Sequence, residues 1–262
     1  MDLDLTGRHA LVCGASQGIG HAAAIELARL GADVTVLARS ADALAATVAM
    51  LPHLHAAQVH GFVAVDMADT DALRRKVESV ANARPVQILV NNTGGPPGGP
   101  AHTAEPSAYL DAFTRHLIAA QSLLGALLPG MRGAGYGRIV NVISTSVKEP
   151  LRNLGVSNTI RGAVANWAKT LATELGPFGI TVNNVLPGYT RTQRLAQIVA
   201  DRMAATGRSA AEIEQAMLAS VPAGRFADAA EIAAAIAFLA APAANYVNGI
   251  NLPVDGGRTQ SL

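Results

Sequence analysis

Residues 10–20 read Ala-Leu-Val-Cys-Gly-Ala-Ser-Gln-Gly-Ile-Gly, a short apolar run that leads directly into three glycines. Ala10 to Cys13 has the unbroken apolar character of a parallel strand buried on both faces. From His21 to Leu30 the apolar residues follow a helical period, and Gly31 is a typical helix stop. Strand, glycine turn and helix form the first half of a βαβ unit, which predicts a parallel sheet covered by helices.

The three glycines have different expected roles in this turn. Gly14 permits the sharp exit from the strand, Gly18 lets a diphosphate approach the backbone, and Gly20 keeps the helix start uncrowded. The helix N-terminus then offers free N–H groups and a positive dipole end to phosphates. The spacing G-x-x-x-G-x-G differs from the G-x-G-x-x-G fingerprint, so a glycine-rich turn in another α/β protein is the alternative.

Composition narrows the class of protein. The 262 residues suffice for one large α/β domain, so we expect a single domain over residues 1–262. Half of the residues are hydrophobic, but neither a membrane span nor a secretory signal is visible. The net charge of +1, with interspersed signs, gives no footprint for nucleic acid. The single cysteine fits a reducing cytoplasm, and His53, His55 and His60 lack the pattern of a metal site, so we expect a cytoplasmic protein without metal.

The rest of the chain alternates between strand and helix candidates. The expected strands cover residues 10–13, 33–38, 61–65, 86–90, 136–144, 180–186 and 249–254. Helices are expected between them, including long ones at Pro106–Met131, ending near Pro129-Gly130, and at Val156–Gly176. This order predicts an α/β fold, a single-domain doubly wound parallel sheet of Rossmann type with about seven strands and helices on both faces.

Four motifs resemble the short-chain dehydrogenase/reductase family, over essentially the whole chain. They are the glycine loop, Asn91-Asn-Thr-Gly94 where the family usually has Asn-Asn-Ala-Gly, Pro187-Gly-Tyr-Thr-Arg-Thr192, and Asp255-Gly-Gly257. The resemblance implies an oxidoreductase that moves hydride between a nicotinamide cofactor and a small-molecule carbonyl or secondary alcohol. It also implies a homotetramer or homodimer, in which the two long helices pair across a two-fold axis.

The resemblance assigns cofactor contacts to the carboxyl ends of the strands. Asp66, followed by Met67, matches the position that contacts the adenine ring, and Pro187 to Thr192 matches the segment that faces the nicotinamide. Arg39 follows the second strand, where a guanidinium can bind the 2′-phosphate of NADP and so favours NADP over NAD. The alternative is that Arg39 only caps the strand or points to solvent. The expected cofactor residues are Gly14, Ser16, Gln17, Gly18, Ile19, Arg39, Asp66, Met67, Asn91, Gly94, Arg161, Pro187, Gly188 and Thr192.

The catalytic motif departs from the family at two positions. Ser144 matches the catalytic serine, but the family's Tyr-x-x-x-Lys is replaced by Ser157 and Arg161, which is similar to a divergent reductase-like branch. Positions i and i+4 share a helix face, so Ser157 can still donate a hydrogen bond to a carbonyl, and Arg161 can hold the ribose and a developing oxyanion. A serine hydroxyl is a much weaker acid than tyrosine and arginine keeps its proton, so the usual proton donor is missing.

Three other residues are candidates for the proton donor. Lys148, on the loop after Ser144, is the leading candidate. The alternative is that Lys148 lies on the surface, paired with Glu149, and has no catalytic role. His116 stands where the family has an Asn that holds a water, but an interface histidine fits equally. Tyr189 either donates the proton or only lines the pocket. The altered motif leaves a second function open, a cofactor-binding protein without redox turnover, such as a sensor or scaffold.

Two segments are expected on the substrate side. Gly94 to Pro100 is irregular, and residues 191–224 carry two amphipathic helical stretches broken at Gly207, which predicts a mobile lid over the substrate. Arg152 or Arg191 favours an anionic substrate if it faces the pocket, with ordinary surface arginines as the alternative. The substrate itself is not encoded in any motif.

Overall fold

One parallel sheet organises residues 1–261, the part of the chain described by the computed structural model. Its strand order is β3-β2-β1-β4-β5-β6-β7, so the order reverses direction between β1 and β4. This confirms the predicted doubly wound parallel sheet, with a switch point where ligands bind in such folds. The strands are β1 (His9–Cys13), β2 (Asp33–Ala38), β3 (His60–Ala64), β4 (Ile88–Asn91), β5 (Gly137–Val142), β6 (Ile180–Pro187) and β7 (Asn251–Val254).

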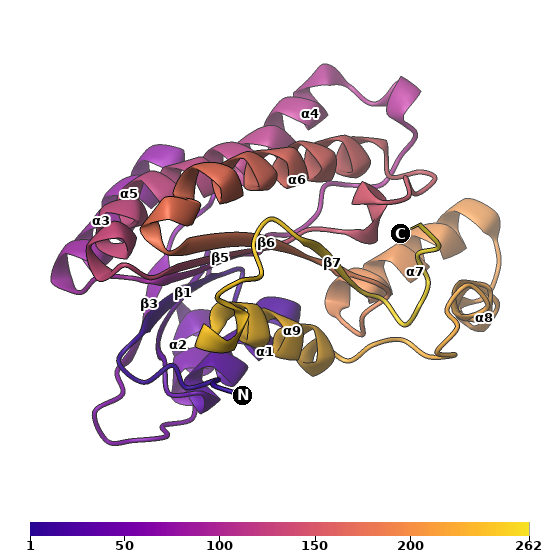
Figure 1. The fold of residues 1–262 in the computed structure, drawn as a ribbon. Helices are drawn as coiled ribbons and strands as arrows, with labels where there is room; N and C mark the ends of the chain where they lie inside the picture. Colours follow the sequence, from indigo (N-terminus) through magenta and orange to yellow (C-terminus); the bar gives the residue numbers. More distant parts are fainter. Residues whose placement is uncertain (262) are drawn as a thin grey trace.

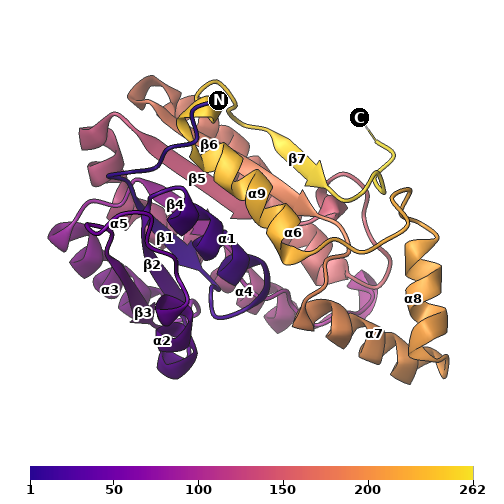
Figure 2. The same cartoon turned by 90° about the horizontal axis from the view of Figure 1, so that it is seen from below.

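Helices cover both faces of the sheet (Figure 1). One layer consists of α1 (Gly18–Arg29), α2 (Ala41–Ala49) and α9 (Ala229–Ala240), and the other of α3 (Thr70–Ala83), α4 (Pro106–Phe113), α5 (Ala119–Ala134) and α6 (Gly155–Leu175). Two further helices, α7 (Gln193–Thr206) and α8 (Ala210–Leu218), lie beyond the end of the sheet to which the strands point (Figure 2). None of the helices in residues 1–261 is both long and apolar enough to span a bilayer.

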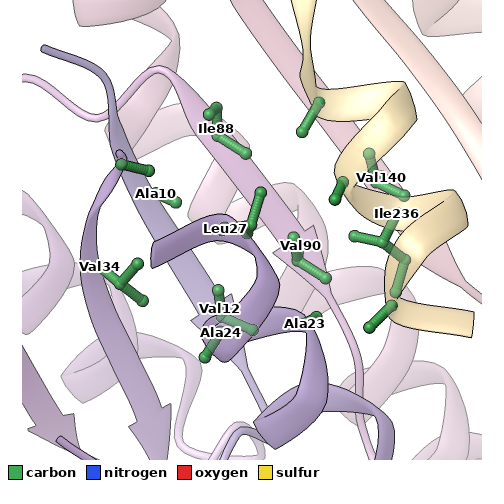
Figure 3. Close-up of a cluster of buried hydrophobic side chains, with 14 of the residues drawn as sticks. Ala10, Val12, Ala23, Ala24, Leu27, Val34, Ile88, Val90, Val140 and Ile236 are labelled. Atoms are coloured by element: carbon green, nitrogen blue, oxygen red, sulfur yellow. The ribbon is translucent and has the colours of Figure 1, made fainter. Parts of the chain in front are cut away.

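The side chains of β1 alternate between two hydrophobic cores, as the pleat of a strand requires. Ala10 and Val12 pack beneath α1 and α9, where Leu27 of α1 joins them (Figure 3), and Leu11 and Cys13 pack beneath α3, α5 and α6. Full burial raises the pKa of the Cys13 thiol to about 12. The first strand is therefore held by apolar burial on both faces, at about 25 cal/mol per Å² of apolar surface.

The predicted long helix over residues 106–131 is present but irregular. A π-helical turn at Thr114–Ile118 separates α4 from α5, and it holds the buried side chain of His116. The prediction that the helix ends near Pro129 is wrong, because α5 continues to Ala134, and the left-handed backbone of Gly135 (φ 57°) ends it. The leucines of α5 are buried against the sheet, and this packing outweighs the backbone hydrogen bond that a proline removes.

Candidate active site

The carboxyl ends of the strands open into a groove of about 1950 Å³. It is bounded on one side by α7 and α8, which stand at that end of the sheet (Figure 2). Thirteen of the fourteen expected cofactor residues line it, and Asn91 does not. Of the four expected catalytic residues, Ser144, Ser157 and Arg161 line the groove, whereas Lys148 lies outside its lining. The groove therefore brings the glycine loop and most of the altered catalytic motif together.

The turn between β1 and α1 has no space for side chains at two of its glycines. A Cβ at Gly14 (φ 59°) would lie 2.6 Å from the carbonyl oxygen of Asn92, and one at Gly20 would lie 2.4 Å from that of Gly14. Asn92 Nδ2 donates to the carbonyl oxygens of Cys13 and Gly14 at 3.3 and 3.2 Å, which fixes the turn against the end of β4. The N-cap residue Gln17 makes no side-chain capping bond within residues 1–261. The first N–H groups of α1 thus remain for a phosphate, so the turn fits a diphosphate.

Charged side chains gather at the end of the groove next to β2 and β3. Asp66 Oδ1 accepts hydrogen bonds from the Ala68 N–H at 2.9 Å and from Arg115 Nη1 at 2.8 Å. The bond from Ala68 and the charges of Arg115 and Arg39 hold the pKa of Asp66 below its usual value. Arg39 is exposed and lines the groove. Two guanidiniums and one ionised carboxylate leave net positive charge at this end, which suits a 2′-phosphate.

Arg161 is a buried cation in the groove wall, with 8% of its surface exposed. Its Nη1 donates to the carbonyl oxygen of Val142 at 2.9 Å, and no carboxylate among residues 1–261 forms an ion pair with it. Burial, followed by the charge of Arg194, lowers the pKa of Arg161 to about 10. It therefore stays protonated at neutral pH, and its charge acts through a medium of low dielectric constant.

Two hydroxyl groups complete this wall. Ser157 precedes Arg161 by one helical turn in α6, and both residues line the groove. Ser144 Oγ accepts a hydrogen bond from the Ser146 N–H at 3.1 Å, which leaves its own O–H proton available as a donor. Two hydroxyl donors and a desolvated cation can bind a carbonyl oxygen and stabilise negative charge on it.

The three candidate proton donors lie in different surroundings. Lys148 follows the 3-10 turn Thr145–Val147 and is half-buried, outside the groove lining. His116 is buried, and this burial, followed by the charge of Arg161, lowers its pKa to about 2, so it is neutral at physiological pH. Tyr189 is half-buried and lines the groove. Of these three, Tyr189 alone borders the groove directly.

Several residues that line the groove were not among the expected site residues, although Asn92 belongs to the Asn91–Gly94 motif. Asn92, Arg115, Arg194 and Arg258 also line the groove. The three arginines stand in no motif, so no signal in the sequence marks them. Arg191, a candidate contact for an anionic substrate, lies outside the lining of the groove. Its Nε is 3.7 Å from a carboxylate oxygen of Asp228.

Four asparagines are joined across the sheet beside the groove. Asn91 Nδ2 donates to Asn141 Oδ1 at 2.8 Å, Asn141 Nδ2 to Asn184 Oδ1 at 2.9 Å, and Asn184 Nδ2 to Asn251 Oδ1 at 2.8 Å. The register of β4 to β7 places these residues side by side. Asn91 is therefore part of an asparagine ladder within the sheet, and its neighbour Asn92 is the one that reaches the groove.

Known proteins are similar to this chain over nearly its whole length. A family model described as enoyl-(acyl carrier protein) reductase matches residues 14–259. Gluconate 5-dehydrogenase from Gluconobacter oxydans is 32% identical over 98% of this chain and 97% of that protein. L-xylulose reductase from Mesocricetus auratus is 35% identical over 98% of each chain. The crystal structure of L-sorbose reductase from Gluconobacter frateurii, complexed with NADPH and L-sorbose, matches 100% of both chains with a TM-score of 0.92 and 31% identity.

Proposed function

We propose a function for this chain from its family, since it belongs to the short-chain dehydrogenase/reductase family. It is an NADP-dependent oxidoreductase that acts on the carbonyl or secondary alcohol of a small molecule. The observation that carries the proposal is the lining of one groove by the glycine loop together with Ser144, Ser157 and Arg161. When bound, the nicotinamide cofactor supplies or accepts the hydride. The residues of the chain bind the cofactor, orient the substrate oxygen and provide the proton.

The cofactor end is assigned to the glycine turn and Arg39. The free N–H groups at the start of α1 hold the diphosphate, and the guanidinium of Arg39 holds the 2′-phosphate. The similar L-sorbose reductase, whose structure contains NADPH, supports NADP as the cofactor. The positive charge that Arg39 and Arg115 leave beside Asp66 supports the same choice.

The substrate oxygen is assigned to the other end of the groove. Ser144 and Ser157 donate hydrogen bonds to it, and Arg161 stabilises the negative charge that develops there. Arg161 also binds the ribose next to the nicotinamide. The lysine of the family motif, which Arg161 replaces, has this role in addition to its part in proton transfer. Its burial supports this role, since a desolvated cation interacts more strongly with an oxyanion than an exposed one does.

The proton is assigned to Lys148, with Tyr189 as the rival donor. Lys148 lies four residues after Ser144, and its side chain is half-buried outside the groove lining. Tyr189 is half-buried and borders the groove. His116 lies close enough to Arg161 for the two to interact electrostatically, and it acts in this scheme only as a neutral link through water.

Residues 191–224 are proposed as the lid. In this segment α7 and α8 are joined at Gly207, which has a left-handed backbone (φ 69°). The two helices share a small hydrophobic cluster with Phe226 that is separate from the two main cores. Such a unit can move over the groove without disturbing the sheet.

Homo-oligomer formation is also proposed, as a tetramer or dimer. Leu110, Phe113 and Ile118 are 68%, 38% and 39% exposed on α4 and the π-helical turn, within one of the two helices expected to pair. Apolar side chains gathered on one helix support an interface there.

Steady-state turnover tests the oxidoreductase assignment. Purified protein is given NADPH and a panel of ketoses, diketones and oxo acids, and NADPH oxidation is followed by absorbance. Turnover of at least one carbonyl, reduced strongly in Arg161→Met, is expected. Tight NADPH binding without turnover of any member would favour the second candidate, a cofactor-binding protein, which the loss of Tyr and Lys from the catalytic motif supports.

A further inference from the structure

Basic side chains outnumber acidic ones in the groove much more strongly than they do in the whole chain. Eight of the 20 lysine and arginine side chains line it, but only two of the 19 acidic ones, Asp66 and Asp201. Asp66 is already paired with Arg115, and Asp201 is exposed on the lid helix α7. With a net charge of +1 for the chain, this excess is a local property of the groove.

The proposed cofactor accounts for part of this charge. Arg39 and Arg115 lie at the end next to Asp66, and Arg161 is assigned to the ribose and the oxyanion. Arg194 Nη2 donates to the carbonyl oxygen of Pro96 at 2.8 Å, so its guanidinium is held against the segment from Gly94 to Pro100. Among the other arginines of the groove, Arg258 contacts the residue that directly follows Ser144.

Arg258 is held beside the serine that is proposed to bind the substrate oxygen. Its Nη1 donates to Thr145 Oγ1 at 3.3 Å, and Thr145 directly follows Ser144. Its guanidinium carbon lies 4.9 Å from the ring centroid of Tyr189, in cation–π geometry. The loop after Ser144, the groove residue Tyr189 and the segment after β7 thus meet at this side chain.

The segment after β7 is fixed in this position by a second set of contacts. Glu149 Oε1 accepts hydrogen bonds from the backbone N–H groups of Gln260 and Ser261 at 2.7 and 2.9 Å. Asp255 Oδ2 accepts one from the Thr259 N–H at 2.8 Å. The backbone next to Arg258 is therefore anchored, so its guanidinium does not require a rearrangement of this segment to bind a ligand.

Arg258 has unused capacity for an anion. A guanidinium carries five N–H donors, and within residues 1–261 this one donates only to Thr145. Its Nε has no hydrogen-bond partner there, and no carboxylate of the described chain forms an ion pair with it. A half-buried guanidinium without a counter-ion, on the lining of a groove, is well suited to a carboxylate ligand.

We infer that the substrate is an oxo acid or the corresponding hydroxy acid, whose carboxylate binds Arg258 while its reacting oxygen binds Ser144 and Ser157. This inference rests on the proposed oxidoreductase function and adds the substrate class to it. Ser144 and Thr145 are adjacent in the chain and both line the groove, so Arg258 and Ser144 border the same part of it. Arg152, exposed on the groove lining before α6, adds attraction at the entrance.

Pairs of substrates with the same carbon skeleton around the carbonyl, one a free acid and one its methyl ester, test the inference. Protein saturated with NADPH is assayed with acetoacetate and methyl acetoacetate, and with levulinate and methyl levulinate. The free acids are expected to have kcat/KM about tenfold to a hundredfold above the esters, the usual range for a charge-assisted hydrogen bond. Arg258→Met should abolish this ratio, Arg258→Lys should retain part of it, and Arg74→Met, an exposed change on α3, should preserve it.

Failure of the inference and failure of the proposed function give different results. Esters that react as well as the acids, or a ratio that survives Arg258→Met, overturn the carboxylate site and leave the oxidoreductase in place. A preference for dihydroxyacetone phosphate over both acids also overturns it, in favour of a phosphate. If no carbonyl reacts, calorimetric titration of the NADPH-loaded protein with the same acids decides. Binding that is lost in Arg258→Met supports the site, and absence of binding refutes it.

Discussion

Arg161 and Val142 are joined by a hydrogen bond of 2.9 Å from the guanidinium Nη1 to the backbone carbonyl oxygen, which ties α6 to the end of β5. The contact explains how an uncompensated cation is tolerated at this depth, since one of its donors is satisfied by a fixed carbonyl dipole. It also sets the direction of the side chain, with its other donors left for ligands in the groove. Arg161 thus links α6 to the sheet and also lines the groove, as its proposed role requires.

The proton donor is open to direct test. We expect Lys148→Met to lower kcat by about 10²–10⁴-fold with little effect on NADPH affinity, because loss of a positioned general acid has that magnitude. Tyr189→Phe is the matched variant for the rival donor. If Lys148→Met keeps full activity and Tyr189→Phe loses it, Tyr189 is the proton donor. The double variant Ser157→Tyr with Arg161→Lys should raise turnover if it restores the usual donor.

Cofactor selectivity should depend on Arg39. A charge-assisted contact to the 2′-phosphate contributes about 1.5–3 kcal/mol, so NADPH is expected to bind roughly tenfold to a hundredfold more tightly than NADH. Arg39→Ala should remove most of this ratio and leave the affinity for NADH almost unchanged. Calorimetric titration of both cofactors measures it. Equal affinities in the wild type, or an unchanged ratio in the variant, would contradict the assignment.

The asparagine ladder should contribute strongly to stability. Asn141 is 1% exposed and bonds to ladder members on both sides. Asn141→Ala leaves Asn91 Nδ2 and Asn184 Oδ1 without these partners, and we expect the free energy of unfolding to fall by roughly 2–5 kcal/mol. Asn251→Ala, at the half-buried end of the ladder, removes one bond and should cost less. Urea denaturation followed by circular dichroism compares the two, and equal losses would argue against the ladder as a unit.

His116 should make the protein sensitive to acid. Its pKa is lowered to about 2 in the folded state, so the unfolded chain takes up a proton first as the pH falls below about 6.5. Stability is therefore lost with falling pH. From pH 7.5 to 5, the free energy of unfolding should drop by roughly 2 kcal/mol more in the wild type than in His116→Asn. Urea denaturation at both pH values tests this, and parallel losses would show that His116 does not titrate as described.

Association should depend on the exposed apolar residues of α4. Leu110 is 68% exposed, so Leu110→Glu is expected to weaken an interface formed by this helix with little effect on the folded subunit. Met50, 63% exposed at the end of α2 in the opposite helix layer, provides the control Met50→Glu. Light scattering at micromolar concentration should give a tetramer or dimer for the wild type and the control. A monomeric wild type would refute the proposal.

The strands were predictable because their physical signal is local. The predicted β1, β2 and β6 begin and end within about one residue of the structural bounds, since a strand buried on both faces is mostly apolar. Among the polar residues within β6, Asn184 bonds across the sheet through its side chain. The glycine turn was equally local, because Gly14 and Gly20 are required by contacts with the adjoining turn and Asn92. The π-helical turn at Thr114–Ile118 was not predictable, as it depends on how α4 and α5 pack.

The groove was predictable only where a motif contributes to it. Ser144, Ser157 and Arg161 follow from the resemblance to the family, and all three line the groove. Arg194 and Arg258 come from segments without a motif and reach the groove through tertiary packing. Asn91 and Asn92 could not be distinguished in the sequence, because the register of β4 decides which of the two side chains enters the sheet.

The packing of α9 on α1 constrains how the chain can fold during its synthesis. A ribosome delivers residues in order, so α1 and the Ala10 and Val12 side chains of β1 emerge long before α9, at residues 229–240, can cover them. Until then the nascent chain exposes an apolar surface of the kind that chaperones bind. The first part of the chain to be made can therefore complete its hydrophobic core only when one of the last parts has been made. Translation that stops before α9 leaves an aggregation-prone product.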